Sequence, residues 1–367
     1  MKKKHILTLI LLLATLTLAA QSNYSPCYTN NMSKGNTAFS QGKYSEAKTY
    51  YSNAKQCAGG NPTAAQSKIN ACDAKIKAQK EAAEAKRKAE QEAAEAKRKA
   101  EQEAAEAKRK AEIQALAKTY IVNGVSFTMN YVEGGTFTMG CTSEQGGDCY
   151  YDEKPIHSVT LSDFLIGETE VTQALWEAVM GTTVGEQRDK ANPSWPMRGE
   201  GASYPMYYVS WNEAVDFCNK LNEKLRSQLP SGYRFALPTE AQWEYAARGG
   251  NKSQHYKYAG SNTLGNVAWY TDNSGSTNHP VKGKQANELG LYDMSGNVWE
   301  WCSDWKWSYS SSPQTNPQGP SSGSSRVLRG GSWSNVGARD CRVSIRRDRV
   351  PDARYYDYGF RLALVHQ

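Results

Sequence analysis

The chain has 367 residues, eight cysteines and a formal net charge of +7 at pH 7. This length leaves room for two or three domains, but most aromatic residues follow residue 120, so the first third cannot bury a sizeable core. No two cysteines are spaced as Cys-x-x-Cys, which argues against a zinc site of the usual kind.

Residues 1–20 have the pattern of a secretory signal peptide. A basic start precedes an apolar run from Ile6 to Leu18, and small residues follow at Ala19 and Ala20. The run is too short for a typical membrane span, although an uncleaved anchor is the alternative. We therefore expect export to the periplasm, the cell surface or the medium. In an exported chain, disulfides are expected and nucleic acid is not an expected partner.

Residues 21–78 carry the pattern of a helical hairpin. Small residues alternate with aromatic ones in GNTAFSQGKYSEAKTYYSNAKQC, which resembles one tetratricopeptide unit. Such a unit does not bury its own face without neighbours. It is therefore either a docking site for an envelope partner or the base of a stalk. Cys57 and Cys72 could clip the hairpin with Cys27 left over, but sequence does not determine the pairing.

Residues 79–118 predict a charged helical spacer. Within them, residues 81–113 contain the 11-residue repeat EAAEAKRKAEQ three times, with one change at the last position. The residues are strong helix formers, and pairs such as Glu84 and Lys88 lie four apart on one face. Leu, Val and Ile are missing until the end, so the repeat has no tight coiled-coil seam and at most a weak right-handed alanine stripe.

Residues 119–367 change abruptly to a composition rich in Gly, Trp, Tyr and Pro. Near-alternation in GVSFTMNYVEGGTFTMG predicts a strand hairpin around Gly134 and Gly135. Amphipathic helices are predicted over residues 172–181, 210–225 and 237–250. A capping box opens each of the last two helices: Ser210 with Glu213, and Thr239 with Gln242.

A series of landmarks over residues 121–365 resembles one known family. The landmarks are EVTQALWEAVMG, NPSWP, YPMYYVSWNEAVDFCNKL, RFALPTEAQWEYAARGG, GLYDMSGNVWEWCSDW, RVLRGGSW and GFRLAL. They occur in the order seen in formylglycine-generating sulfatase-modifying factor domains. The resemblance implies an α+β fold related to C-type lectins, with long loops, preceded here by the helical hairpin and the spacer. The family includes oxidases, sulfoxide synthases and members that catalyse nothing.

The catalytic residues of the family's enzymes are missing. Formylglycine generators resemble this chain up to Gly-Gly-Ser and then carry two copper-binding cysteines, whose places fall here on Asn335 and Asp340. Only Cys341 is nearby, and one thiolate cannot form the two-coordinate copper(I) site. The five histidines include no HxxxH pair of the kind expected in the iron-dependent members. Neither copper nor iron is expected.

The resemblance also implies a disulfide. In the family, the cysteine of the long helix is bonded to one in the C-terminal segment, which here pairs Cys218 with Cys341. Cys141 and Cys149 enclose a short loop that a second disulfide could close. Cys302 is expected to be buried beside its tryptophan neighbours, as a small apolar residue.

Calcium is the ion that the resemblance implies. Family members bind it through oxygen atoms near the motif SGNVWEW, where Asn297, Glu300 and the carbonyl of Val298 are the ligands expected here. A second set is expected to consist of Asn266, the carbonyl of Val267 and Asp272. The alternative is that Asn297 and Glu300 only satisfy backbone groups in a tight loop.

The segment 329–362 combines an ordered frame with an irregular interior. The frame residues are Arg329, Gly330, Gly331, Ser332, Trp333, Cys341, Arg342, Arg346, Pro351, Gly359, Phe360 and Arg361. The interior mixes tyrosine, arginine, aspartate and apolar residues, as recognition surfaces do. The residues expected to bind a ligand are Asn335, Val336, Asp340, Ile345, Arg347, Asp348, Arg349, Val350, Ala353, Tyr355, Tyr356, Asp357 and Tyr358.

This arrangement resembles the variable proteins of diversity-generating retroelements, in which adenine-directed mutagenesis changes asparagine codons between fixed anchors. The favoured hypothesis is an exported, non-catalytic protein that binds a protein or glycan ligand through residues 334–358. The alternatives are a protein-modifying oxidase of the formylglycine-generating type and a structural subunit of an envelope assembly. The absent cysteine pair separates the favoured hypothesis from the oxidase, and a nearby reverse-transcriptase gene would separate it from the structural subunit.

Overall fold

The computed structural model describes residues 24–147, 149–334 and 337–366. The predicted signal peptide lies outside these residues. The chain divides into two compact units, Met1–Ala105 and Glu106–Gln367. Within the described residues, no helix combines the length and the apolar character that crossing a membrane requires.

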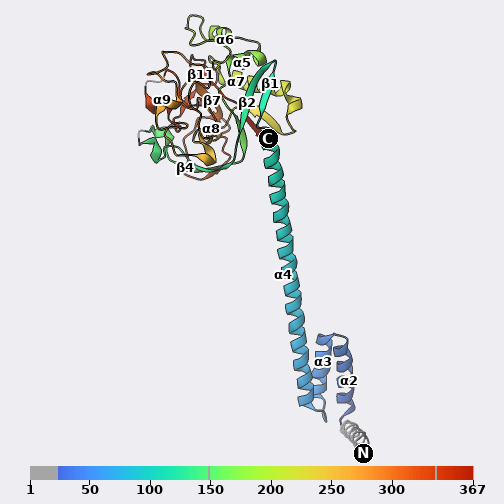
Figure 1. Ribbon diagram of the computed structural model, residues 1–367. Helices are drawn as coiled ribbons and strands as arrows, with labels where there is room; N and C mark the ends of the chain where they lie inside the picture. Colours follow the sequence, from blue (N-terminus) through green and yellow to red (C-terminus); the bar gives the residue numbers. More distant parts are fainter. Residues whose placement is uncertain (1–23, 148, 335–336, 367) are drawn as a thin grey trace, which may run out of the picture. The chain divides into compact units, whose positions relative to one another are not determined.

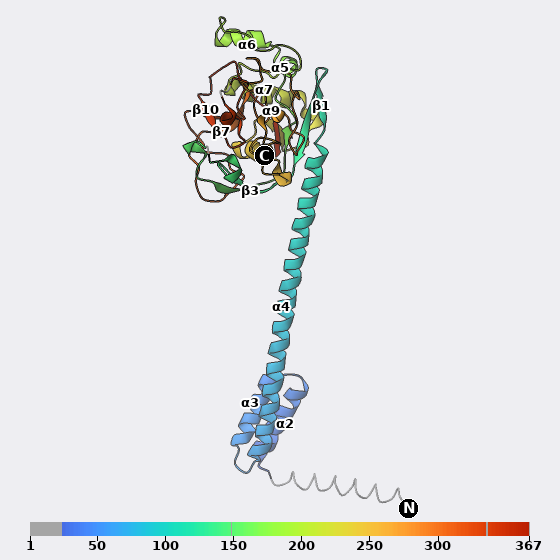
Figure 2. The ribbon, with the colours of Figure 1, turned by 60° about the vertical axis from the view of Figure 1, so that its left-hand side comes forward.

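The N-terminal unit contains three helical segments where the sequence predicts a hairpin. They are α2 (Pro26–Ser40), α3 (Tyr44–Gln56) and the first part of α4 (Pro62–Ala115). Figure 2 shows them side by side. The buried cluster between them consists of Ala38, Ala47, Tyr51, Ile69 and Cys72. The start of α4 therefore covers the apolar face that a hairpin alone would leave exposed.

The cysteines of this unit pair differently from the arrangement considered from sequence. Cys27 at the start of α2 is bonded to Cys57 at the end of α3. Cys72 is a free, fully buried thiol in the cluster between the helices. Cys72 points inward because it occupies an apolar position of α4, and burial raises the pKa of its thiol.

Helix α4 runs without a break through all three repeats (Figure 1). The repeats carry ion pairs four residues apart, such as Lys86–Glu90 and Lys97–Glu101, whose side chains are largely exposed. Exposed pairs of this kind add little stability. The last turns differ, because Ile113 and Leu116 are buried in the core of the C-terminal unit.

The C-terminal unit is an α+β domain of short elements joined by long loops (Figure 1). Its helices are α5 (Gln173–Met180), α6 (Val184–Ala191), α7 (Trp211–Lys224), α8 (Glu240–Ala247) and α9 (Leu264–Val267). Its strands are β1 (Thr119–Val122), β2 (Val125–Val132), β3 (Gly135–Met139), β4 (His157–Leu161), β5 (Phe164–Gly167), β6 (Tyr233–Ala236), β7 (Trp299–Trp305), β8 (Gln314–Thr315), β9 (Arg326–Arg329), β10 (Arg347–Arg349), β11 (Tyr358–Gly359) and β12 (Ala363–His366).

The strands form three sheets with the orders β1-β2-β5-β12-β6, β10-β9-β7-β11 and β3-β4-β8. Strand β12, near the end of the chain, lies between β5 and β6. The irregular C-terminal segment therefore connects two sheets. Strand β9, at its start, belongs to the second sheet, whereas β12, directly after it, belongs to the first. This topology makes the segment a part of the core framework.

The predicted hairpin around Gly134 and Gly135 is wrong. Strand β2 pairs with β1 and β5, whereas β3 pairs with β4 in another sheet. A Cβ atom on Gly134 would lie 2.4 Å from the carbonyl oxygen of Leu161, so glycine permits a close backbone approach there. The hairpin is instead β1–β2, and its two-residue turn is Asn123-Gly124, a pair favoured where both residues have positive φ.

The predicted helices are confirmed by their caps. Capping boxes at Ser210 and Thr239 begin α7 and α8. Helix α5 begins after Thr172 and ends at Gly181, which has a φ of 72°. The sequence reading missed α6, although Thr183 and Glu186 form a capping box there too.

Ile113→Ala should lower the free energy of unfolding of the C-terminal domain by about 2–5 kcal/mol, because it removes a buried side chain from the core. Denaturant unfolding of the wild-type and variant chains measures the difference. Ala111→Gln, on the exposed side of the same helix, is the control and should change stability by less than about 0.5 kcal/mol. Equal effects of both changes would mean that α4 does not contribute to this core.

Candidate functional site

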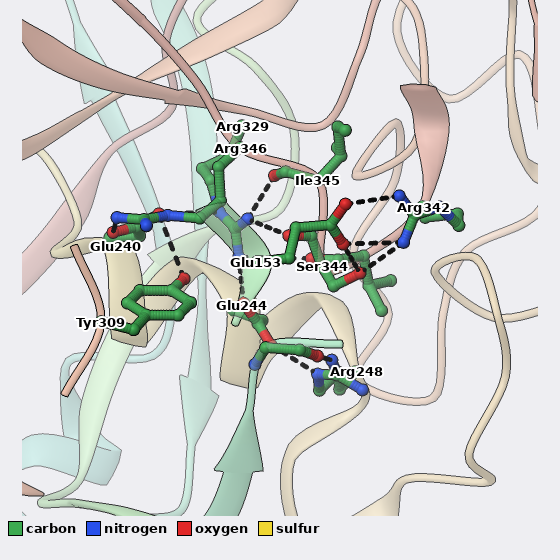
Figure 3. A network of polar contacts seen from close by, with 12 residues as sticks. Glu153, Glu240, Glu244, Arg248, Tyr309, Arg329, Arg342, Ser344, Ile345 and Arg346 are labelled. Carbon is green, nitrogen blue, oxygen red and sulfur yellow. Dashed lines mark hydrogen bonds and ion pairs between the residues drawn. The ribbon is translucent and has the colours of Figure 1, made fainter. Parts of the chain in front are cut away.

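Buried arginine–glutamate pairs anchor the C-terminal segment. The pairs are Arg329 with Glu244, Arg342 with Glu153, Arg346 with Glu240 and Arg361 with Glu300. Figure 3 shows the first three pairs close together. Each arginine comes from the segment, and each glutamate comes from an earlier part of the chain. The pairs therefore tie the segment to α8, to β7 and to the loop before β4.

The charges of this network stabilise one another. Burial by itself raises the pKa of Glu240, but the charges of Arg346 and Arg329 outweigh it and lower that pKa to about 2. Burial likewise raises the pKa of Glu153, whereas hydrogen bonds from Arg342 and Ser344 lower it overall. Both carboxylates are therefore ionised at neutral pH, and removing one partner would leave an uncompensated buried charge.

Two glycines shape the start of the segment. Gly330 and Gly331 have φ angles of 96° and 79°. A Cβ atom on Gly331 would lie 2.4 Å from the carbonyl oxygen of Asp340 and 2.9 Å from the sulfur of Cys341. The chain therefore turns so tightly here that residues 340 and 341 pack directly on its backbone, which only glycine allows.

The structure divides the predicted ligand-binding residues into exposed and buried groups. Asn335 and Val336 lie outside the described residues. Those with partly or largely exposed side chains are Asp340, Arg347, Asp348, Arg349, Val350, Ala353, Tyr355 and Tyr356. Ile345, Asp357 and Tyr358 are buried.

The buried residues support the surface and do not form it. Asp357 accepts hydrogen bonds from the hydroxyls of Ser332 and Ser334, at 2.8 and 2.9 Å. Tyr358 lies in β11, which pairs with β7, and its ring packs against Trp301. The sequence did not predict which of these side chains are buried, because the segment contains almost no regular strand in which inward and outward residues alternate.

A cavity of about 360 Å³ lies against the segment, and we name it the Trp299 hollow. Its lining residues are Tyr150, Tyr151, Asp152, Trp299, Asp340, Ile345, Arg346 and Arg347. The guanidinium of Arg347 lies 5.4 Å from the Trp299 ring, and the Tyr150 hydroxyl donates to Asp340 at 3.0 Å. Tyr151 is 90% exposed. The hollow thus combines aromatic area with charged groups, as recognition sites do.

The sequence reading missed Tyr150, Tyr151 and Trp299 as parts of this site. The two tyrosines belong to the loop after Cys149, far from the segment along the chain. Two adjacent tyrosines next to a disulfide-closed loop are the only signal that could have drawn attention to them.

An aromatic cluster extends the surface on another side. Tyr355 is 39% exposed, and its ring lies 5.4 Å from that of Trp195. Tyr356 packs at the same distance against Trp333, over which Arg198 lies at 5.3 Å. These rings provide rigid contact area with little rotamer entropy to lose.

The predicted disulfide between Cys218 and Cys341 is wrong. Both cysteines are free and buried. Cys218 packs with Phe217 in the largest core cluster, whereas Cys341 packs with Tyr258 in a separate one, so the sulfurs lie in different parts of the interior. Burial raises the pKa of both thiols to about 12. At neutral pH Cys341 is therefore protonated and a poor nucleophile or metal ligand.

Two other cysteine predictions agree with the structure. Cys141 and Cys149 form a disulfide. Cys302 is fully buried. The loop that the disulfide closes leads directly into the tyrosines of the Trp299 hollow, so the bond holds one wall of the site.

The residues of the first predicted calcium set already have protein partners. The Asn297 carboxamide accepts from the backbone N–H of His279 at 3.0 Å and donates to Glu170 at 2.7 Å. The N–H of Val298 donates to the other oxygen of Glu170. Glu300 forms a bidentate pair with Arg361. These contacts match the alternative in which the residues organise a tight loop.

In the second set, the carbonyl of Asn266 accepts from Gln285 at 3.0 Å. The Val267 side chain is buried and Asp272 is exposed. Calcium binding by either set stays a prediction.

Comparison with known proteins identifies the domain. Residues 122–365 match the family model of the sulfatase-modifying factor enzyme 1-like domain. The chain belongs to this family. A formylglycine-generating enzyme of Streptomyces coelicolor is 32% identical over 287 residues, which cover 63% of this chain and 87% of that protein. A protein named chaperone protein LppX, from Paenibacillus barcinonensis, is 35% identical over 57% of this chain and 79% of its own length.

Two solved structures share the fold of this sulfatase-modifying factor domain. Variable protein 1 of Treponema denticola is 40% identical, with a TM-score of 0.57 over 67% of this chain and 98% of that one. PvdO from Pseudomonas aeruginosa is 23% identical, with a TM-score of 0.55 over 68% of this chain and 98% of that one, and it shows the fold alone. The resemblance to both the modifying-factor family and the variable proteins is confirmed.

Glu240→Gln should destabilise the domain by about 3–5 kcal/mol at pH 7, because Arg346 loses its buried partner. The pKa of Glu240 is depressed in the folded state, so its stabilisation is present above pH 4.5 and is lost as the pH falls towards 2. The variant should therefore lose less stability than wild type over that interval, as measured by denaturant unfolding at several pH values. Glu223→Gln, at an exposed position, is the control. If the free energy of unfolding changed with pH in the same way for the wild type and both variants, Glu240 would not have the stabilising role assigned to it.

Proposed function

We propose that this chain is an exported binding protein whose C-terminal surface recognises a protein or glycan ligand. The binding surface consists of the Trp299 hollow and the exposed residues of the segment between Asp340 and Tyr356. The observation that carries the proposal is the division of one short segment into two classes of side chain. Its frame arginines are buried and paired, while Arg347, Val350 and Tyr355 between them reach the surface.

Such a division permits the surface to change without loss of the fold. Val350 is 57% exposed, so replacing it removes few core contacts. Substitutions of exposed side chains usually change stability by less than about 0.5 kcal/mol. The 40% identity to a Treponema denticola protein named a variable protein supports a surface that differs between copies of the gene.

Export is supported by two features. The first twenty residues have the signal-peptide pattern, and the two disulfides are typical of a chain that folds in an oxidising compartment. The N-terminal bundle of α2, α3 and the start of α4 is proposed to contact an envelope partner. The structural-subunit alternative shares this part of the proposal and differs in requiring no variation in the segment.

The oxidase alternative is favoured by one observation, the 32% identity to a formylglycine-generating enzyme. Against it, Cys341 is the only cysteine in the segment, and its thiol is fully buried. A copper(I) site or a thiol-exchange step needs an accessible thiolate. We therefore propose that this member of the family is not an oxidase.

The gene should vary between isolates at defined codons. Deep sequencing of the region encoding residues 334–358 should find substitutions at Arg347, Val350 and Tyr355 and none at Arg342 and Arg346, whose loss would unpair buried glutamates. A reverse-transcriptase gene and a near-copy of the segment's coding DNA should lie nearby. Equal variation at frame and exposed codons, or no variation with neither DNA element present, would contradict the proposal.

The purified chain should not oxidise a cysteine-containing peptide and should not bind copper(I) stoichiometrically. Mass spectrometry of the peptide and copper titration measure these two properties. The formylglycine-generating enzyme of Streptomyces coelicolor, assayed in parallel, is the positive control. Turnover by this chain that Cys341→Ser abolishes would establish the oxidase alternative instead.

A further inference from the structure

A second cavity lies on the other side of Arg346 and contains none of the exposed segment residues. Its volume is about 500 Å³, which is within the range of small-molecule sites. It lies beside the start of α8, the end of β7 and the loop that follows β7. We name it the Trp307 cavity, after the most exposed aromatic residue in its lining.

Aromatic residues at alternate positions form one wall of the Trp307 cavity. In the sequence WKWSY, Trp305, Trp307 and Tyr309 all line it. Side chains two apart in an extended chain lie on the same side. Trp307 is 67% exposed and makes no ring contact or hydrogen bond with any described residue. Its indole is therefore a free flat surface at the edge of a cavity, and folding does not require it.

Two polar side chains with unused hydrogen-bonding capacity also line the cavity, and the ring of one of them, His157, lies 4.7 Å from that of Tyr309. Asp304 is 5% exposed, and its Oδ2 accepts from the backbone N–H of Glu240 and from Ser303, both at 2.9 Å. Its Oδ1 has no hydrogen-bond partner among the described residues. His157 is also 5% exposed and contacts the carbonyl of Pro155 only through Nδ1. Asp304 Oδ1 and His157 Nε2 therefore keep hydrogen-bonding capacity toward the cavity, where the hydroxyl groups of a ligand can use it.

The charges around the cavity select against ionic ligands. Arg346 lines the cavity, but its guanidinium donates to both carboxylate oxygens of Glu240, at 2.6 and 2.7 Å. Its charge is therefore already paired and offers little attraction to an anionic ligand. A cationic ligand would meet Arg346 above Tyr309, at 3.8 Å from the ring, and Arg326 above Trp305, at 3.4 Å. The site is thus suited to a neutral molecule.

We propose that the Trp307 cavity is a binding site for a neutral saccharide. The apolar face of a sugar ring stacks on Trp307, while its hydroxyl groups hydrogen-bond to Asp304 and His157. Sugars combine one apolar face with a rim of hydroxyls, which matches a cavity lined by an exposed indole and by two polar side chains with unused hydrogen-bonding capacity. Burial and the charge of Glu240 raise the pKa of Asp304 to about 7, so this carboxyl can donate as well as accept near neutral pH. The site is separate from the proposed variable surface and does not depend on it.

Saturation-transfer NMR on the full chain tests the proposal with cellobiose, maltose and N,N′-diacetylchitobiose as probes. At least one of these neutral disaccharides should receive saturation from the protein. Trp307→Ala should weaken its binding about tenfold, because the stacking surface is lost. Asp304→Asn, which keeps the size of the side chain, should also weaken it. Glucuronic acid and glucosamine should bind more weakly than the neutral sugars.

Ile121→Ala is the control, because Ile121 is an exposed apolar residue of β1 that lines neither the Trp307 cavity nor the Trp299 hollow and should leave sugar binding unchanged. Trp307→Ala should melt close to the wild-type temperature, since its side chain is mostly exposed and makes no ring contact or hydrogen bond with any described residue. The proposal is overturned if no neutral disaccharide binds, if Trp307→Ala binds as well as wild type, or if a charged sugar binds more tightly. None of these outcomes affects the sequencing test of the variable surface, so the two proposals fail separately.

Discussion

Pairing of buried arginines with buried glutamates is the constraint on which the C-terminal domain depends. A buried guanidinium is tolerated only when a carboxylate meets it with good geometry. Here Arg329, Arg342, Arg346 and Arg361 each find a glutamate from a distant part of the chain. The pairs hold a segment with little regular secondary structure in one conformation. They also separate the residues that must stay constant from those that face solvent.

The same network organises both cavities. Arg346 lines the Trp299 hollow and the Trp307 cavity, and its pairing with Glu240 forms the partition between them. One wall of the hollow comes from the irregular segment, whereas the Trp307 cavity is lined mainly by α8, by β7 with the loop after it, and by the sheet of β3, β4 and β8. The domain thus resembles a scaffold with loops, in which function resides in the loops.

The cysteines show how burial decides chemistry. The same residue type forms one disulfide between Cys141 and Cys149 but a free thiol at Cys341, which lies deep in an apolar cluster. In this sulfatase-modifying factor domain, the cysteine of the C-terminal segment is therefore part of the packing.

The sequence by itself determined the family and the helices α4, α5, α7 and α8, because these depend on local patterns: the repeats of α4, the capping boxes at Ser210 and Thr239, and the spaced glycine and arginine anchors. Tertiary structure alone decided the sheet partners of β2 and β3, the pairing of Cys27 with Cys57, and the burial of Asp357 and Tyr358. It also brought Tyr150, Tyr151 and Trp299 to one hollow. Those features depend on contacts between distant residues, and local periodicity carries no information about which distant partner a strand, a sulfur or a guanidinium will meet.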